Sequence, residues 1–161
     1  MRVIANWASV NVLVVASLVS CVPADFRDFH GSVVESFEPA TEPAEDDFFS
    51  EPRRALGPPD GRTVALGFGS RLTLRFFRPV PNGDGPDIRI YEVGADGAAA
   101  RVSVSTEGNR FVPFEDPATG LATDYDLTEV RQDGVIFVRL EGLDDAGQEP
   151  GFDLDAVEAL H

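Results

Sequence analysis

Lysine is missing from this 161-residue chain, and all 13 of its basic residues are arginines. Without lysine the chain has no Schiff-base nucleophile, no lysine general base and no Walker-type phosphate site. Against the 13 arginines stand 28 aspartates and glutamates, which give a formal charge of −15 at pH 7. Because affinity for nucleic acid depends on basic charge, we expect no nucleic-acid partner.

Histidine and cysteine are nearly as scarce. The two histidines are His30 and His161, and the one cysteine is Cys21. A single cysteine excludes an internal disulfide, and no cluster of histidine and cysteine indicates zinc. Neither histidine is well placed for a Ser-His-Asp site, so we predict that the chain is not an enzyme. A hydrolase that uses a pair of carboxylates is the remoter alternative, since 28 acids do not exclude two at a catalytic distance.

The first twenty residues have the features of an export signal. They hold one charge, Arg2, followed by a short apolar stretch that polar residues interrupt. This pattern is typical of a secretory signal peptide, and a transmembrane anchor, which needs about 20 largely apolar residues, is the alternative. We predict a signal peptide over residues 1–20 and a short tether over residues 21–31.

The segment Leu18-Val19-Ser20-Cys21 resembles the lipobox of bacterial lipoproteins. The resemblance implies that Cys21 carries acyl chains such as palmitate and anchors the chain to a membrane; an ordinary signal peptide with a stray cysteine is the alternative. Val22 stands where an aspartate tends to retain lipoproteins on the inner membrane. The resemblance therefore implies the bacterial outer membrane or cell surface as the location.

The predicted domain spans residues 32–161. After an acidic, proline-containing stretch over residues 41–52, which we expect to be a surface loop, apolar residues recur at every second position between turns. This is the period of half-buried strands. Leu72, Leu74 and Phe76, for example, alternate with polar neighbours between turn-forming glycines and prolines. Seven or eight strands at this spacing predict an all-β fold, a single antiparallel β-sandwich of the jelly-roll type. The predicted strands lie in residues 32–37, 71–76, 87–92, 101–105, 111–114, 135–140 and 152–160.

Three further motifs carry a family resemblance. They begin at Ala55 (ALGPPDG, followed by VALGFG), at Gly85 (GPDIRIYE) and at Gly151 (GFDLDAVEAL). Their order resembles bacterial cell-surface domains that are related to galactose-binding-like jelly rolls and to carbohydrate-binding modules. The resemblance covers residues 32–160 and implies the fold and an exterior location more than any activity.

Two carboxylates fall at apolar positions of the predicted strands. Strict alternation places Glu92 and Glu158 toward the edge of the core, where a buried carboxylate needs an arginine, backbone donors or a cation. Calcium is the natural ion for an exported protein. The galactose-binding-like resemblance implies a structural calcium between Asp60 in an early loop and Glu158 in the terminal strand; pairing with arginines is the alternative. Further oxygen ligands are expected among Asp87, Glu92, Asp153 and Asp155.

The predicted function is a surface-interaction or structural role for a lipid-anchored domain, with a surface protein or a glycan as the unknown partner. The alternative is a carbohydrate-binding module. Sugar rings commonly stack on aromatic side chains, and the one tryptophan, Trp7, lies in the predicted signal peptide. Tyr91, on the polar side of its predicted strand, is then the candidate residue for contact with a sugar.

Overall fold

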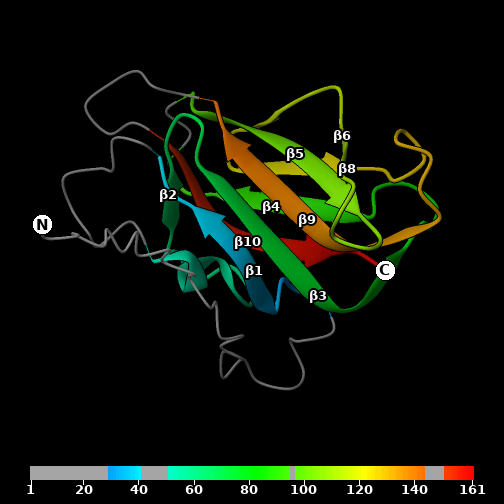
Figure 1. Ribbon diagram of the computed structural model, residues 1–161. Coiled ribbons are helices and arrows are strands. Elements are labelled where there is room, and N and C mark those ends of the chain that lie inside the picture. The colour runs from blue at the N-terminus through cyan, green and yellow to red at the C-terminus, as the bar shows by residue number, and fades with distance from the viewer. Residues whose placement is uncertain (1–28, 41–50, 95–96, 144–150) are drawn as a thin grey trace, which may run out of the picture.

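The computed structural model describes residues 29–40, 51–94, 97–143 and 151–161, which form two antiparallel β-sheets packed against each other (Figure 1). The predicted signal peptide, Cys21 and most of the predicted tether lie outside these residues. Within the described ranges no helix is long and apolar enough to cross a membrane.

The larger sheet has six strands in the order β1-β3-β9-β5-β6, with β7 also paired to β5. Its strands are β1 (Val33–Glu38), β3 (Arg71–Pro81), β5 (Ala99–Ser105), β6 (Val112–Pro113), β7 (Ala118–Thr119) and β9 (Gly134–Gly142). The alternation noted in the sequence sets their orientation, because every second side chain of a strand points to the same face. Leu72, Leu74 and Phe76 of β3 accordingly point inward and are fully buried.

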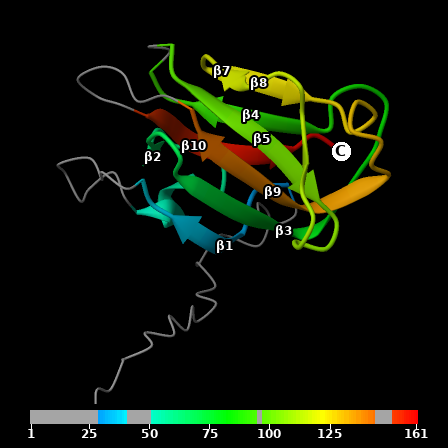
Figure 2. The same cartoon turned by 45° about the horizontal axis from the view of Figure 1, so that its top comes forward.

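The smaller sheet has four strands in the order β2-β10-β4-β8. Its strands are β2 (Val64–Leu66), β4 (Ile88–Glu92), β8 (Ala122–Tyr125) and β10 (Phe152–Ala159), and the one short helix of the described part, η3 (Pro52–Ala55), packs against β10, β1 and β2. At the other edge β8 lies beside β7 of the larger sheet (Figure 2).

The core lies between the two sheets and joins them into one sandwich. Its largest fully buried side chains include Phe76, Phe152, Leu66, Leu140 and Ile90. The prediction of an all-β antiparallel sandwich is confirmed. The described residues form ten strands rather than seven or eight, because β2, β7 and β8 are only two to four residues long, too short to show alternation.

A β-bulge in β10 corrects the predicted orientation of Glu158. Leu154 lies opposite Glu92, but Ala156 lies opposite Tyr91, so Asp155 is an extra residue in β10. Such an extra residue exchanges the two faces of everything that follows it. The buried residue near the end of β10 is therefore Val157, and Glu158 points outward with its side chain 27% exposed. The prediction that Glu158 faces the core was wrong.

The described part of the chain begins within the predicted tether. Residues 29–31 run beside β10: the N–H of Gly31 donates to the carbonyl of Val157, and the N–H of Ala159 donates to the carbonyl of Phe29. His30 forms an isolated antiparallel bridge with Glu158. These bonds attach the N-terminal end of the described chain to an interior strand of the smaller sheet.

Candidate functional site

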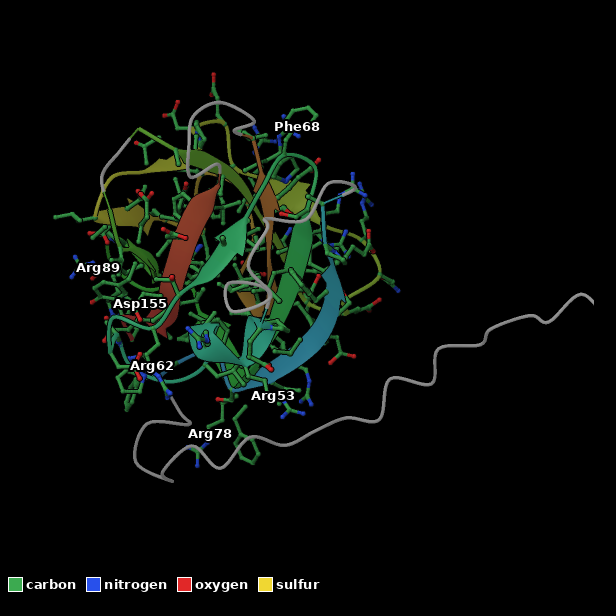
Figure 3. All side chains as sticks on the ribbon, turned by 90° about the vertical axis from the view of Figure 1, so that its left-hand side faces the viewer. Arg53, Arg62, Phe68, Arg78, Arg89 and Asp155 are labelled. Atoms are coloured by element: carbon green, nitrogen blue, oxygen red, sulfur yellow. The ribbon has the colours of Figure 1, made fainter. Side chains whose placement is uncertain are left out.

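Tyr91 lies on the outer face of the smaller sheet, among polar side chains from three neighbouring strands. The register places Glu158, Arg89 and Asp124 side by side in one row across β10, β4 and β8. The next row holds Ala156, Tyr91 and Ala122. We call Arg89, Tyr91, Asp124 and Glu158 the Tyr91 face; Figure 3 shows the position of Arg89 on this side of the molecule.

Short hydrogen bonds fix the side chains of the Tyr91 face. Arg89 donates from Nε and Nη2 to the two carboxylate oxygens of Asp124 at 2.6 and 2.7 Å. The hydroxyl of Tyr91 donates to Oε2 of Glu158 at 2.6 Å. A bidentate arginine–carboxylate pair is planar and directional, so both groups present fixed edges to solvent.

These bonds also shift the protonation equilibria. The hydrogen bond from Arg89 holds the pKa of Asp124 below its ordinary value, and the bond to Asp124 raises the pKa of Arg89. Glu158, by accepting the hydroxyl proton of Tyr91, raises the pKa of that hydroxyl, and partial burial raises it further. At neutral pH the face therefore carries a charged arginine–aspartate pair beside a protonated tyrosine.

The alanines on both sides of Tyr91 leave its ring little covered by neighbouring side chains. Toward β10, Ala156 is fully buried, and the hydroxyl of Tyr91 reaches over this strand to Glu158. Toward β8, the neighbour is Ala122, which is exposed and contributes only a methyl group. Tyr91 is partly exposed, and in the adjoining row Asp124 of β8 holds the guanidinium of Arg89.

His30 extends this network at the edge of the sheet. Its Nε2 lies 3.9 Å from Oε1 of Glu158, and its side chain is almost fully buried. Glu158 therefore has Tyr91 on one carboxylate oxygen and His30 near the other. The sequence placed His30 on the tether, and only the pairing of residues 29–31 with β10 brings it here.

The predicted early loop does meet the terminal strand, but through Asp155. The backbone N–H groups of Asp60 and Gly61 donate to the carboxylate of Asp155 at 3.1 to 3.2 Å. The side chain of Asp60 accepts the N–H of Arg62, while Glu158 is bonded to Tyr91. Among the described residues no group of three or more histidine, cysteine, aspartate or glutamate side chains could hold a metal ion. Calcium bound by Asp60 and Glu158 stays a prediction.

The other predicted oxygen ligands are spread over the sandwich. Asp87 is fully buried at the start of β4, and its carboxylate accepts the N–H groups of Gly83 at 2.6 Å and Leu127 at 2.7 Å. Glu92 is buried at the other end of β4, about 17 Å away for a five-residue strand. Asp153 lies opposite Ala65 of β2. Asp87 and Glu92 therefore belong to opposite ends of the molecule and do not share a site.

Three exposed apolar side chains were not predicted from the sequence. Phe68 is 61% exposed, Val93 40% and Leu121 62%. They lie in turns at one end of the sandwich, which we call the loop end: the N–H of Glu92 donates to the carbonyl of Leu121, and the N–H of Gly69 donates to that of Gly142. Figure 3 shows Phe68 well apart from Arg89 and Asp155. Glycines on both sides of Phe68 were the available signal, since they place it in a turn rather than in an alternating strand.

No protein-family model matches the chain, and no curated protein matches it. Solved structures do. The CBM32 module of AlyQ, in complex with 4,5-unsaturated mannuronic acid, has 12% identity and a TM-score of 0.52, with 80% of this chain and 95% of that chain covered. Chitosan-binding module 1 of a chitosanase/glucanase from Paenibacillus sp. IK-5 has 14% identity and a TM-score of 0.52, over 78% of this chain and 92% of that chain. The C-terminal domain of a chitobiase from Bacteroides fragilis has 11% identity and a TM-score of 0.55, over 89% and 96%.

At these identities the likeness concerns the fold alone. The sandwich is that of the CBM32 carbohydrate-binding modules, in agreement with the galactose-binding-like jelly roll implied by the sequence.

Proposed function

We propose that the chain is a carbohydrate-binding module, the alternative in the sequence analysis, rather than a purely structural domain. The observation that carries the proposal is the likeness of the whole sandwich to CBM32 modules, one of which was solved with a sugar acid bound. The likeness covers most of both chains, so the described part matches an entire module rather than a fragment of one.

The Tyr91 face is the proposed site for the glycan. Sugar recognition combines an apolar surface with a few fixed polar groups that set the orientation of the ligand. Tyr91 supplies the aromatic ring, and the paired Arg89 and Asp124 supply fixed donors and acceptors at its uncovered side. Because these groups are already held by hydrogen bonds, binding orders few side chains.

A glycan array tests this proposal, with the full-length chain and two matched variants. Tyr91→Ala should abolish saturable binding to the glycan that the wild type selects, whereas Phe68→Ala, which removes an exposed ring at the loop end, should leave it within about twofold. Loss of binding in Phe68→Ala alone would place the site at the loop end instead. An array without any saturable signal would overturn the proposed function.

We also propose that the module is exported and held at the outer membrane or cell surface by a lipid on Cys21. The support is the lipobox resemblance in the sequence, since Cys21 lies outside the described residues. Two or more acyl chains give stable membrane attachment, whereas one gives marginal binding. Metabolic labelling with a fatty-acid analogue should mark the wild type and not Cys21→Ser, and the variant should leave the membrane fraction or stay uncleaved. Unlabelled, fully soluble wild-type protein would end this proposal.

A further inference from the structure

The outer face of the larger sheet carries an arginine in an unusual setting. Arg139 lies in the middle of β9, between β3 and β5. Its Nε donates to the hydroxyl of Thr73 at 3.1 Å, and its guanidinium carbon lies 3.6 Å from the centre of the Phe111 ring. One bond and one ring contact therefore fix the plane of the guanidinium.

Three other arginines on the outer face of this sheet are paired with glutamates. Arg75 bonds to Glu35 at 3.2 Å, while Arg71 and Arg101 lie 3.3 and 3.5 Å from Glu141. Arg139 has no such partner: no carboxylate of the described ranges lies within ion-pair distance of it. No described residue accepts a hydrogen bond from its Nη1 or Nη2 either. As far as the described residues go, both terminal nitrogens thus lack an acceptor and can bond to a ligand.

Arg139 places on the outer face of the larger sheet a positive charge that no described glutamate balances. The three paired arginines, Arg71, Arg75 and Arg101, have Glu35, Glu38 and Glu141 as partners. An unbalanced guanidinium favours an anionic ligand at this position.

Hydroxyl groups flank Arg139 in the same row across the sheet. The register aligns Ser36, Thr73, Arg139 and Ser103 on β1, β3, β9 and β5. Three strand spacings make this row about 14 Å long. The Thr73 hydroxyl is buried and already bonded to Arg139, so the row offers one charged fork with the partly exposed serines Ser36 and Ser103 on its two sides. Such a line of polar groups suits linked, hydroxylated rings better than a single small anion.

We propose that this row is a second binding site, which takes the carboxylate of a uronic-acid residue in an acidic polysaccharide on the free edge of Arg139. The planar guanidinium forms two parallel hydrogen bonds to a carboxylate, a geometry that lysine cannot reproduce. The serine hydroxyls contact the sugar hydroxyls on each side. This site is separate from the Tyr91 face, which lies on the other sheet, and it does not depend on glycan binding there.

Calorimetric titration of the full-length chain with a uronic-acid hexasaccharide tests the proposal. The comparison ligand is the same oligosaccharide with its carboxyl groups reduced to alcohols. The acidic form should bind at least about tenfold more tightly than the reduced form, because hydrogen bonds between charged groups are the strong ones. Arg139→Gln should remove this preference. Arg75→Gln, which breaks a paired arginine on the same face, should leave affinity within about twofold.

Two controls keep the outcomes distinct. If Arg139→Gln proves unstable in a melt, Arg139→Lys keeps the charge and should still lose most of the preference, because the fork is gone. Equal binding of the two oligosaccharides, equal losses in the Arg139 and Arg75 variants, or no binding would each overturn this inference. Loss of the acidic ligand in Tyr91→Ala but not in Arg139→Gln would also overturn it while supporting the proposed function. If the acidic oligosaccharide bound while the glycan array gave no other signal, the result would support the site at Arg139 and contradict the proposed glycan site at the Tyr91 face.

Discussion

Two acidic side chains of the smaller sheet, Asp87 just before β4 and Asp155 in β10, are buried and hold backbone turns, whereas Glu35 and Glu38 on the larger sheet are exposed and pair with arginines. Asp87 and Asp155 are 0% and 5% exposed, and both accept backbone N–H groups from turns. The side chains of Glu35 and Glu38 are 48% and 66% exposed, and each lies near one arginine.

The same residue type thus has two physical roles in one fold. A buried carboxylate with backbone donors is expensive to remove, because the donors lose their acceptor away from water. An exposed ion pair contributes little to stability, because water screens it and two long side chains must be held in place. The buried carboxylates are therefore needed for the fold. The exposed glutamates contribute little to stability, so the outer face of the larger sheet can change its contacts when a ligand binds. Five predictions test this difference.

The largest effect is expected for Asp87→Ala. The substitution removes the acceptor of the Gly83 and Leu127 N–H groups at a fully buried position. The free energy of unfolding should fall by about 3 kcal/mol or more in urea titrations. Asp84→Ala, in the same turn but exposed, should change it by less than about 0.5 kcal/mol. Similar losses in the two variants would contradict the comparison.

Calcium comes next, if the predicted ion binds. A ligand of the folded state adds about 2.7 kcal/mol at a hundredfold excess over its Kd, so the melting midpoint should rise by several degrees and fall again with chelator. Since Glu158 would have to release the hydroxyl of Tyr91, calcium should also lower the raised pKa of Tyr91. Absorbance titration of the tyrosines, with Tyr91→Phe as control, measures that shift. If calcium changed neither the melting midpoint nor the pKa of Tyr91, the predicted calcium site would be wrong.

A smaller loss is expected for Asp155→Ala. Its carboxylate also accepts backbone N–H groups, but the donors Asp60 and Gly61 are exposed and can bond to water once the acceptor is gone. We expect a loss of about 1 to 2 kcal/mol, below that of Asp87→Ala. Thermal melts of both variants give the ranking, and the reverse order would show that exposure of the donors does not decide the cost.

Protonation of Asp124 in acid should break its ion pair with Arg89, with only a small loss in the free energy of unfolding. The pKa of Asp124 is lowered in the folded state, so the pair stabilises the fold above the ordinary pKa of aspartate and stops doing so as the pH falls through the lowered value. The stability difference between wild type and Asp124→Asn should therefore vanish below that value. It should stay under about 1 kcal/mol at pH 7, because the pair is exposed. A difference that persists in acid would point to packing instead.

The smallest effect is expected for Glu141→Gln on the larger sheet. Glu141 lies near Arg71 and Arg101, at 3.3 and 3.5 Å, on a face open to solvent. The free energy of unfolding should change by no more than about 1 kcal/mol, and less at high salt. A loss as large as that of Asp155→Ala would remove the distinction between the two kinds of acid.

The sequence was sufficient for the long strands and the core. Leu72, Leu74 and Phe76 of β3 and Val138 and Leu140 of β9 stand at alternate positions, and their burial follows from the pleat. The sequence did not predict the short strands β2, β7 and β8 or the β-bulge in β10. Nothing in a single strand states which partner residue it skips, and Ala156 is small enough to fit either face, so strict alternation sent Glu158 to the wrong side.

For the candidate site, the sequence predicted the position of a residue on its own strand but not its neighbours on other strands. Alternation places Tyr91 on the polar side of β4, where the structure also has it. Its partners come from β8 and β10, and their positions depend on cross-strand register, which is a tertiary property. For the same reason Arg139 showed nothing unusual in the sequence: its row of hydroxyls exists only once four strands are aligned.

The pairing of residues 29–31 with β10 also limits how far the module can stand from an anchor. Cys21 lies eight peptide steps before Phe29, so even a fully extended connection spans at most about 29 Å. A lipid on Cys21 would keep the sandwich close to the bilayer, within reach of glycans at the membrane surface but not of distant ones. Tension on such an anchor would arrive first at the bonds from Phe29 and Gly31 to β10, the strand that also carries Glu158. The force would then act on the same sheet that carries the proposed glycan site.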